Sequence, residues 1–222
     1  MSGNGRGVLL VIEGPEGAGK STQVKRLGAR LQARGKSHLE LREPGGTPLG
    51  ERIRQILLDD PASEISPAAE AALFIASRAE LVSRVVRPAM GRGTVVTLDR
   101  FFLSTYAYQV YGRGLSEESV RGANALATGG LVPDLTILLR LSSAEGMRRA
   151  DRRGTRDRME SSGEAFHRRV EDAFALFATP AWQGSHPECG PIATVEGGGS
   201  AEEVEGAIHQ LLAARWPDIF AD

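Results

Sequence analysis

One segment near the N-terminus constrains the fold of this chain more than any other. Residues 14–21 read Gly-Pro-Glu-Gly-Ala-Gly-Lys-Ser and match the pattern G-x-x-x-x-G-K-[ST]. The segment follows a short apolar run at residues 8–12 and precedes a stretch, residues 20–34, whose apolar residues have helical spacing. A strand, a glycine-rich loop and a helix in this order predict a loop whose backbone N–H groups, with the N-terminus of the helix, bind phosphate.

The residue types in this loop predict a bound nucleoside triphosphate. Lys20 should reach the β- and γ-phosphates, and the hydroxyl of Ser21 should ligate Mg²⁺. Lysine is rare in this chain, which otherwise uses arginine, and this makes Lys20 more informative. The expected ATP-binding residues are Gly14, Pro15, Glu16, Gly17, Ala18, Gly19, Lys20, Ser21 and Thr22.

Predicted strands and helices alternate along the chain. After the strand at 8–12, strands are expected at 39–41, 94–98, 135–141 and 192–195. Helices are expected at 48–58, from 67 towards 88, and at 103–111, 117–127, 164–177 and 200–216, with another running from 145 into an arginine-rich stretch. This pattern predicts an α/β chain with a five-stranded parallel sheet covered by helices on both faces, a three-layer P-loop fold. We expect residues 1–222 to form a single domain.

Composition excludes several classes of protein. The hydrophobic content of 41% and the charged content of 25% are typical of a globular protein. The formal net charge of −1 offers no basic excess for binding a nucleic acid polymer. The apolar run at 8–12 is far shorter than the roughly 20 residues of a membrane-spanning helix. Because Cys189 is the only cysteine, no internal disulfide can form, and we expect a cytoplasmic protein without nucleic acid or membrane partners.

A second acidic position is predicted beside the phosphate loop. Residues 94–99 have the form of a buried strand that ends in Asp99, and ligands of open α/β sheets lie at the carboxyl ends of strands. Asp99 should therefore hold the metal through a water molecule, and Arg100 should lie beside a phosphate. The chain has no N-K-x-D motif, which argues against a GTPase, and no lysine at Pro15 or Glu16, which argues against a partitioning ATPase.

Several further motifs, in order along residues 8 to about 160, resemble those of the thymidylate kinase family, which are P-loop nucleoside-monophosphate kinases. The motifs are residues 14–22, Arg42-Glu43-Pro44-Gly45-Gly46-Thr47, Phe74 with Arg78, Asp99-Arg100, Ser104-Thr105-x-Ala107-Tyr108-Gln109, residues 133–136, and an arginine-rich stretch through Asp157-Arg158-x-Glu160. The resemblance implies an enzyme that transfers the γ-phosphoryl group of ATP to dTMP, giving dTDP and ADP. It also implies Mg²⁺ as cofactor, no tightly bound prosthetic group, and a homodimer.

The resemblance assigns an acceptor site to residues outside the phosphate loop. It implies that Glu16 binds the 3′-hydroxyl group of dTMP, and that Tyr108 crowds C2′ and so disfavours ribonucleotides. Phe74 and Arg78 lie four residues apart, on one face of a helix, where a ring can stack on thymine and a guanidinium can donate to its O4 atom. The full acceptor-binding set is Glu16, Glu43, Pro44, Phe74, Arg78, Arg100, Thr105, Tyr108 and Gln109.

Because the acceptor is already an anionic phosphate, transfer needs neutralised charge and positioning rather than a general base. The expected catalytic residues are Lys20, Asp99, Arg100 and an arginine of a lid at residues 148–163. The phosphate loop carries no arginine, so the lid should supply it, as in the bacterial-type branch of the family. Arg153 is the first choice, with Arg149 expected to stack on adenine, but Arg149, Arg152 and Arg156 stay open as alternatives.

Two other functions remain as alternatives at this point. One is another small-molecule P-loop kinase, with a different nucleoside or nucleotide as acceptor. The other is a regulatory or partitioning P-loop ATPase, which would hydrolyse ATP without dTMP.

Overall fold

The computed structural model describes residues 6–59, 64–142, 145–146, 148–149, 158–159 and 162–221. The strands are β1 (Leu9–Glu13), β2 (His38–Arg42), β3 (Val95–Asp99), β4 (Leu135–Arg140) and β5 (Ile192–Glu196). The α-helices are α1 (Lys20–Ala33), α2 (Pro48–Leu58), α3 (Pro67–Leu81), α4 (Arg87–Gly91), α5 (Phe102–Thr105), α6 (Glu117–Thr128), α8 (Glu164–Phe177), α9 (Pro180–Ser185), α10 (Ala201–Arg215) and α11 (Pro217–Phe220). Two π-helices, η1 (Val82–Val86) and η2 (Tyr106–Gly112), and the 3-10 helix η3 (Pro187–Cys189) complete the described elements.

The five strands form one parallel sheet in the order β2-β3-β1-β4-β5. The predicted fold class is confirmed. Strand β1 lies at the centre and pairs with β3 on one side and β4 on the other. The loop after β1 and the turn after β3 therefore leave the same edge of the sheet side by side, which is where ligands of such sheets bind.

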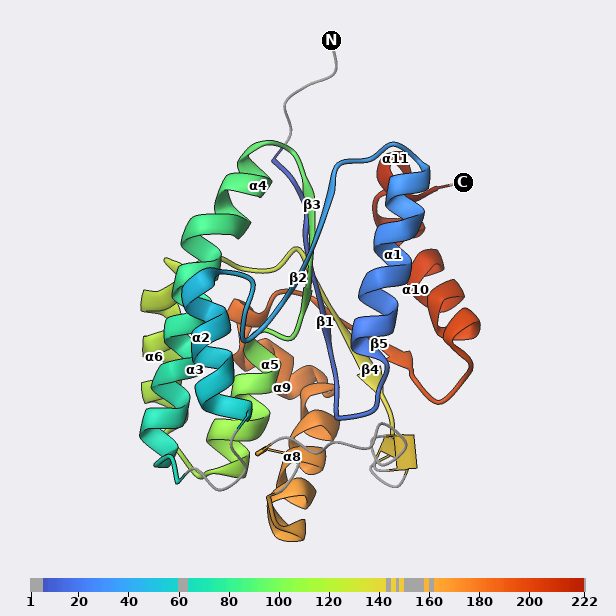
Figure 1. Ribbon diagram of the computed structural model, residues 1–222. Helices are drawn as coiled ribbons and strands as arrows, with labels where there is room; N and C mark the ends of the chain where they lie inside the picture. The colour runs from blue at the N-terminus through green and yellow to red at the C-terminus, as the bar shows by residue number, and fades with distance from the viewer. Residues whose placement is uncertain are drawn as a thin grey trace.

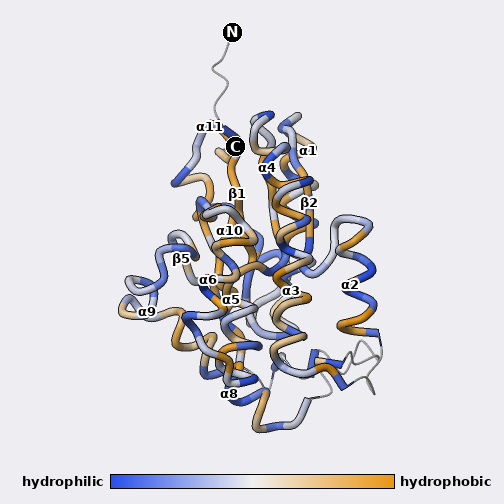
Figure 2. Tube along the Cα trace, turned by 90° about the vertical axis from the view of Figure 1, so that its left-hand side faces the viewer, coloured by the Kyte–Doolittle hydropathy of each residue, from blue (hydrophilic) through white to orange (hydrophobic). Residues whose placement is uncertain are grey.

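Helices cover both faces of the sheet and bury two apolar clusters (Figure 1). Alternate residues of β1 point to opposite faces, so Leu10 and Ile12 pack with α1, α10 and α11, whereas Leu9 and Val11 pack with α3, η1 and η2. All five residues of β1 are buried, and Figure 2 shows this strand as a hydrophobic segment in the middle of the molecule. A central parallel strand is apolar on both faces for this reason.

Helix starts follow the predicted capping residues. The Thr47 hydroxyl accepts a hydrogen bond from the N–H of Gly50, with Pro48 as the first helical residue. At α10 the predicted capping box is confirmed, since the side chains of Ser200 and Glu203 each accept a hydrogen bond from the other's backbone N–H.

The structure differs from the predicted helices in two places. The expected helix at 103–111 is α-helical only in α5 and continues as the π-helix η2, and the expected helix from 67 towards 88 contains the π-helix η1. In η2 the side chains of Tyr106 and Gln109 are both buried, but they pack in different surroundings, against α9 and against α3. Tertiary packing sets this wider turn, so residue spacing alone could not predict it.

Candidate active site

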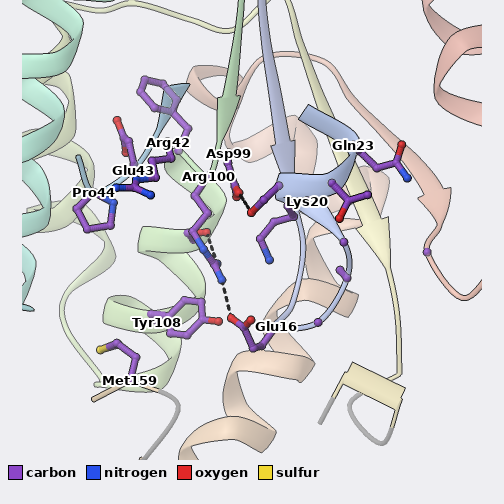
Figure 3. Close-up of a pocket in the computed structure, with 18 of the residues that line it drawn as sticks. Glu16, Lys20, Gln23, Arg42, Glu43, Pro44, Asp99, Arg100, Tyr108 and Met159 are labelled. Atoms are coloured by element: carbon purple, nitrogen blue, oxygen red, sulfur yellow. Dashed lines mark hydrogen bonds and ion pairs between the residues drawn. The ribbon is translucent and has the colours of Figure 1, made fainter. Parts of the chain in front are cut away.

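A cavity of about 590 Å³ lies at the carboxyl ends of β1 and β3. It is lined by many of the predicted site residues: Glu16, Gly17, Ala18, Gly19, Lys20, Ser21, Thr22, Glu43, Pro44, Phe74, Arg78, Asp99, Arg100, Thr105, Tyr108, Gln109 and Arg149. The fold thus brings residues from across the chain to one hollow (Figure 3). Gly14 and Pro15 contribute differently, since their carbonyl oxygens accept hydrogen bonds from Lys20.

The phosphate loop curls around the side chain of Lys20. The Nζ atom donates to the carbonyl oxygens of Gly14 at 3.0 Å and Pro15 at 2.7 Å. Gly17 and Gly19 have positive φ angles of 73° and 84°, a conformation that glycine adopts without steric strain. A Cβ atom at Gly17 would lie 2.4 Å from the carbonyl oxygen of Gly146, so the loop also touches the chain just before the predicted lid.

Lys20 is a buried cation whose charge is only partly compensated. Lys20 is only 6% exposed. Burial, and after it repulsion from Arg100, lowers the pKa of Lys20 from 10.5 to about 8, against the attraction of the carboxylates of Glu16, Asp99 and Glu13. The site therefore holds a cation that gains from the arrival of an anion.

Ser21 and Asp99 meet between the two adjacent strand ends. The Ser21 hydroxyl donates a hydrogen bond to the Oδ2 atom of Asp99 (Figure 3). A hydroxyl and a carboxylate are hard oxygen ligands, the kind that Mg²⁺ prefers. This pair fits the predicted metal position. Among the described residues no group of three or more His, Cys, Asp or Glu side chains forms a separate metal site.

Glu13 is a site residue that sequence reasoning missed. Its buried carboxylate ends β1 and accepts hydrogen bonds from the backbone N–H of Phe101 at 2.7 Å, the N–H of Ser104 at 3.0 Å and the Ser104 hydroxyl at 2.7 Å. It thus fixes the turn after β3, in which Arg100 has a φ of 73°, the only positive φ of a non-glycine residue in the described chain. A glutamate that ends an apolar strand, just before the glycine-rich loop, was the available signal.

Arg100 occupies the centre of the cavity. Its guanidinium donates to Glu16 Oε2 at 3.0 Å and to the Ser104 hydroxyl at 3.0 Å, and lies 5.4 Å from the centre of the Tyr108 ring. Burial alone would lower the pKa of Arg100, but Tyr108 and the carboxylates of Glu16 and Asp99 raise it above its ordinary value. A carboxylate within a phosphate loop would repel a triphosphate if it pointed into the loop. Glu16 is instead turned towards Arg100 and Tyr108 (Figure 3).

The second predicted arginine, Arg78, is held inside a buried polar cluster. Its Nε and Nη2 atoms both donate to Glu43 Oε2, at 2.9 and 2.6 Å. Nη2 also donates to the Phe101 carbonyl oxygen at 2.7 Å, and Nη1 to Asn124 Oδ1 at 2.5 Å. Arg78 thus donates four hydrogen bonds to protein groups. Glu43, predicted as a ligand contact, also holds the Arg78 guanidinium in place.

The opposite end of the cavity is formed by a loop whose function was not predicted. Gly197, Gly199, Ala201 and Val204, from the end of β5 and the start of α10, line it together with Gln23 of α1. Glycines after the fifth strand were the only sequence signal for this wall.

The arginine-rich segment divides into residues with different surroundings. Arg149 donates to the carbonyl oxygens of Gly197 and Gly198 at 3.0 Å each, so it reaches the wall beside α10. Arg148 is exposed and pairs with Glu145. Arg158 is buried and donates to Glu70 and to the Leu57 carbonyl oxygen. The candidates Arg152, Arg153 and Arg156 lie outside the described residues.

Comparison with known proteins identifies close relatives. The family profile described as thymidylate kinase matches residues 12–183. The thymidylate kinase of Deinococcus radiodurans is 53% identical over 169 residues, which cover 76% of this chain and 82% of that protein. The thymidylate kinase of Chlorobium chlorochromatii is 48% identical over 178 residues, covering 75% and 80%. That of Gloeobacter violaceus is 44% identical over 211 residues, covering 92% and 96%. In the described residues, no helix is both long and apolar enough to span a bilayer.

The lowered pKa of Lys20 predicts a pH-dependent stability. The native protein binds fewer protons than the unfolded chain between pH 8 and 10.5, so holding the charge at pH 7 costs about 3 kcal/mol, a cost that falls as pH rises through this window. Replacing Lys20 with Met removes this cost together with two hydrogen bonds. We expect Lys20→Met to raise the free energy of unfolding at pH 7 by about 1–3 kcal/mol, and by less at pH 9.5.

Urea unfolding of the two proteins at both pH values measures this difference. Lys25→Met, on the exposed face of the same helix, is the matched control and should change stability by no more than about 0.5 kcal/mol. A Lys20→Met variant that is less stable than the parent at both pH values would contradict the argument.

Proposed function

The chain belongs to the thymidylate kinase family and is a dTMP kinase, and on that premise we propose how its cavity is divided between the two substrates. The enzyme transfers a phosphoryl group from ATP to dTMP, giving dTDP and ADP, so an acceptor of another kind is not the main substrate. The observation that carries the division is that one cavity is lined both by the phosphate loop with Lys20 and by Phe74 and Arg78, with Arg100 lining it as well.

The donor end is assigned to the phosphate loop and the wall beside α10. The backbone N–H groups at the start of α1, with Lys20, bind the triphosphate, because a helix N-terminus and a buried cation both favour anions. Arg149, held against Gly197 and Gly198, lies where an adenine ring can stack on its guanidinium. Ser21 and Asp99 would hold Mg²⁺, which when bound neutralises phosphate charge.

The acceptor end is assigned to α3, η2 and the turn at Glu43. Phe74 stacks on the thymine ring, and Arg78, Thr105 and Gln109 contact its polar edge. Glu16 binds the sugar 3′-hydroxyl, and Tyr108 crowds C2′. Glu43 and Pro44 close this end, and the ion pair of Glu43 with Arg78 holds the guanidinium in place before the base arrives.

Catalysis in this arrangement is charge neutralisation along the line between the two phosphates. Because the attacking oxygen is already an anion, these residues need only hold it against the γ-phosphoryl group and offset the repulsion. Lys20 and Arg100 supply cations at the centre, with Asp99 orienting the donor side. We assign the remaining cation to Arg153 of the arginine-rich segment, by resemblance to the bacterial-type branch.

Arg153→Ala should reduce kcat by about 10³-fold while KM for both substrates changes little, because this cation acts mainly in the transition state. Steady-state kinetics with ATP and dTMP measure the separation. Arg148→Ala is the control, since Arg148 is exposed and paired with Glu145. A rise in KM alone would make Arg153 a binding residue, and an equal loss for Arg152→Ala or Arg156→Ala would move the role to that position.

The acceptor phosphate has a further cation within reach. Arg54 of α2 lines the cavity and donates to the Pro44 carbonyl oxygen at 3.1 Å. Arg54→Gln should raise KM for dTMP by about tenfold or more and leave KM for ATP unchanged, because the lost charge lies at the acceptor end. Arg52→Gln, exposed on the same helix, is the matched control. Equal effects on both KM values would contradict this assignment.

We also propose a cytoplasmic homodimer that associates through α2, α3 and α6. These helices pack together on one side of the sheet (Figure 1), and Ile56 of α2 and Leu126 of α6 are 53% and 88% exposed. Large apolar side chains this exposed suit an interface with a second copy.

Light scattering should give twice the chain mass, and Leu126→Glu should shift the protein towards a single chain. A single-chain mass for the parent protein would refute the dimer.

A further inference from the structure

Glu70 lies at the centre of a buried hydrogen-bond network that the substrate assignments do not use. Glu70 belongs to the first turn of α3 and is fully buried. Its Oε1 atom accepts from Gln109 Nε2 at 3.0 Å and from Arg113 Nε at 3.2 Å. Its Oε2 atom accepts from Arg113 Nη2 at 3.1 Å and from Arg158 Nη2 at 2.6 Å.

This network keeps Glu70 ionised. Burial by itself would raise its pKa, but the hydrogen bonds from Arg113, Gln109 and Arg158 outweigh burial and hold the pKa of Glu70 below its ordinary value. Two guanidinium groups next to one carboxylate also make protonation unfavourable.

An ionised carboxylate only accepts hydrogen bonds, and this determines which way the Gln109 amide faces. The amide must present its NH₂ group to Glu70. Gln109 also lines the cavity, and within the described chain its Oε1 atom has no hydrogen-bond donor. The oxygen is therefore the end of the amide left for a ligand.

The three residues Glu70, Phe74 and Arg78 are spaced by four along α3 and so follow one face of the helix. Phe74 and Arg78 line the cavity, whereas Glu70 does not; of its hydrogen-bond partners among the described residues, Gln109 is the one that lines the cavity. A base stacked on Phe74 would thus meet a donor, Arg78, and an acceptor, the Gln109 oxygen.

We propose that Glu70 is a positioning residue for base selectivity: it locks the Gln109 amide so that only its oxygen faces the acceptor base. This inference rests on the proposed contacts of Arg78 and Gln109 with the base. A thymine presents the acceptor O4 next to the donor N3–H, which matches a guanidinium beside an amide oxygen. A cytosine presents the donor N4–H₂ next to the acceptor N3, the reverse pattern, and Gln109 cannot rotate to suit it while Glu70 holds its NH₂ group.

Replacing Glu70 with Gln tests the lock. A neutral amide can both donate and accept hydrogen bonds, so the Gln109 amide is free to flip in this variant. The measured quantity is the ratio of kcat/KM for dTMP to kcat/KM for dCMP. We expect Glu70→Gln to lower this ratio by about tenfold or more, and Gln109→Met to lower it by a similar factor. Glu80→Gln, on the same helix and paired with Arg84 at the surface, is the matched control and should leave the ratio unchanged.

The double variant separates positioning from general structural damage. If Glu70 acts through Gln109, Glu70→Gln should not lower the ratio further once residue 109 is Met. A ratio unchanged in Glu70→Gln, or lowered equally in the parent and Gln109→Met backgrounds, would overturn the inference. A ratio unchanged in Gln109→Met would instead refute the proposed base contact on which it rests.

A conservative variant covers the case in which Glu70→Gln does not fold, as judged by circular dichroism. Glu70→Asp keeps an acceptor-only group and takes its place in the same cycle. Any loss of selectivity in Glu70→Asp should disappear in the Gln109→Met background. A Glu70→Asp variant that keeps the dTMP-to-dCMP ratio while kcat/KM for dTMP falls also agrees with the proposal, because Asp still only accepts hydrogen bonds from Gln109. Loss of selectivity that persists without Gln109 would overturn it.

Discussion

Two polyanions must meet at one point in this molecule, and the rest of the structure depends on keeping cations charged where they meet. Lys20 is buried after the loop that follows β1, and Arg100 is half-buried after the adjacent strand β3, where each charge acts strongly on a phosphate. Removing a cation from water is unfavourable, and the lowered pKa of Lys20 shows that its neighbours compensate only part of the loss. In the proposed arrangement the arriving phosphates complete the compensation, so the same imbalance that weakens the fold favours the substrate.

The sheet supplies the rigidity that this arrangement requires. Parallel strands bring successive loops to one edge, and Glu13 connects the two loops by accepting hydrogen bonds from the turn after β3. Arg100 is thereby kept in a left-handed conformation that an arginine rarely adopts. Strained backbone of this kind persists only when the surroundings determine it from several directions, and here β1, β3 and α5 all contribute.

The two ends of the cavity differ in the interactions that they offer to a ligand. At the end that we assign to the donor, backbone N–H groups, glycines and a helix N-terminus form a surface suited to phosphate. At the end that we assign to the acceptor, buried carboxylates fix side chains: Glu43 forms an ion pair with Arg78, and Glu70 accepts a hydrogen bond from Gln109. A phosphate is recognised by charge and needs little orientation, whereas a base is recognised by the pattern of donors and acceptors at its edge and needs each group held in one orientation.

The sequence by itself determined the fold class and the phosphate-loop segment, and it predicted most residues that line the cavity, Ser21 and Asp99 among them. These depend on local signals, such as an apolar strand before a glycine-rich loop and motifs in a known order, and such signals can be read without coordinates. Tertiary structure alone decided the π-helical turns of η2, the hydrogen bonds of Arg78 with Glu43 and Asn124, and the buried hydrogen bonds of Glu13 and Glu70. Each of those depends on contacts between residues far apart in the chain, and an isolated glutamate has the same appearance in a sequence whether it faces water or a buried arginine.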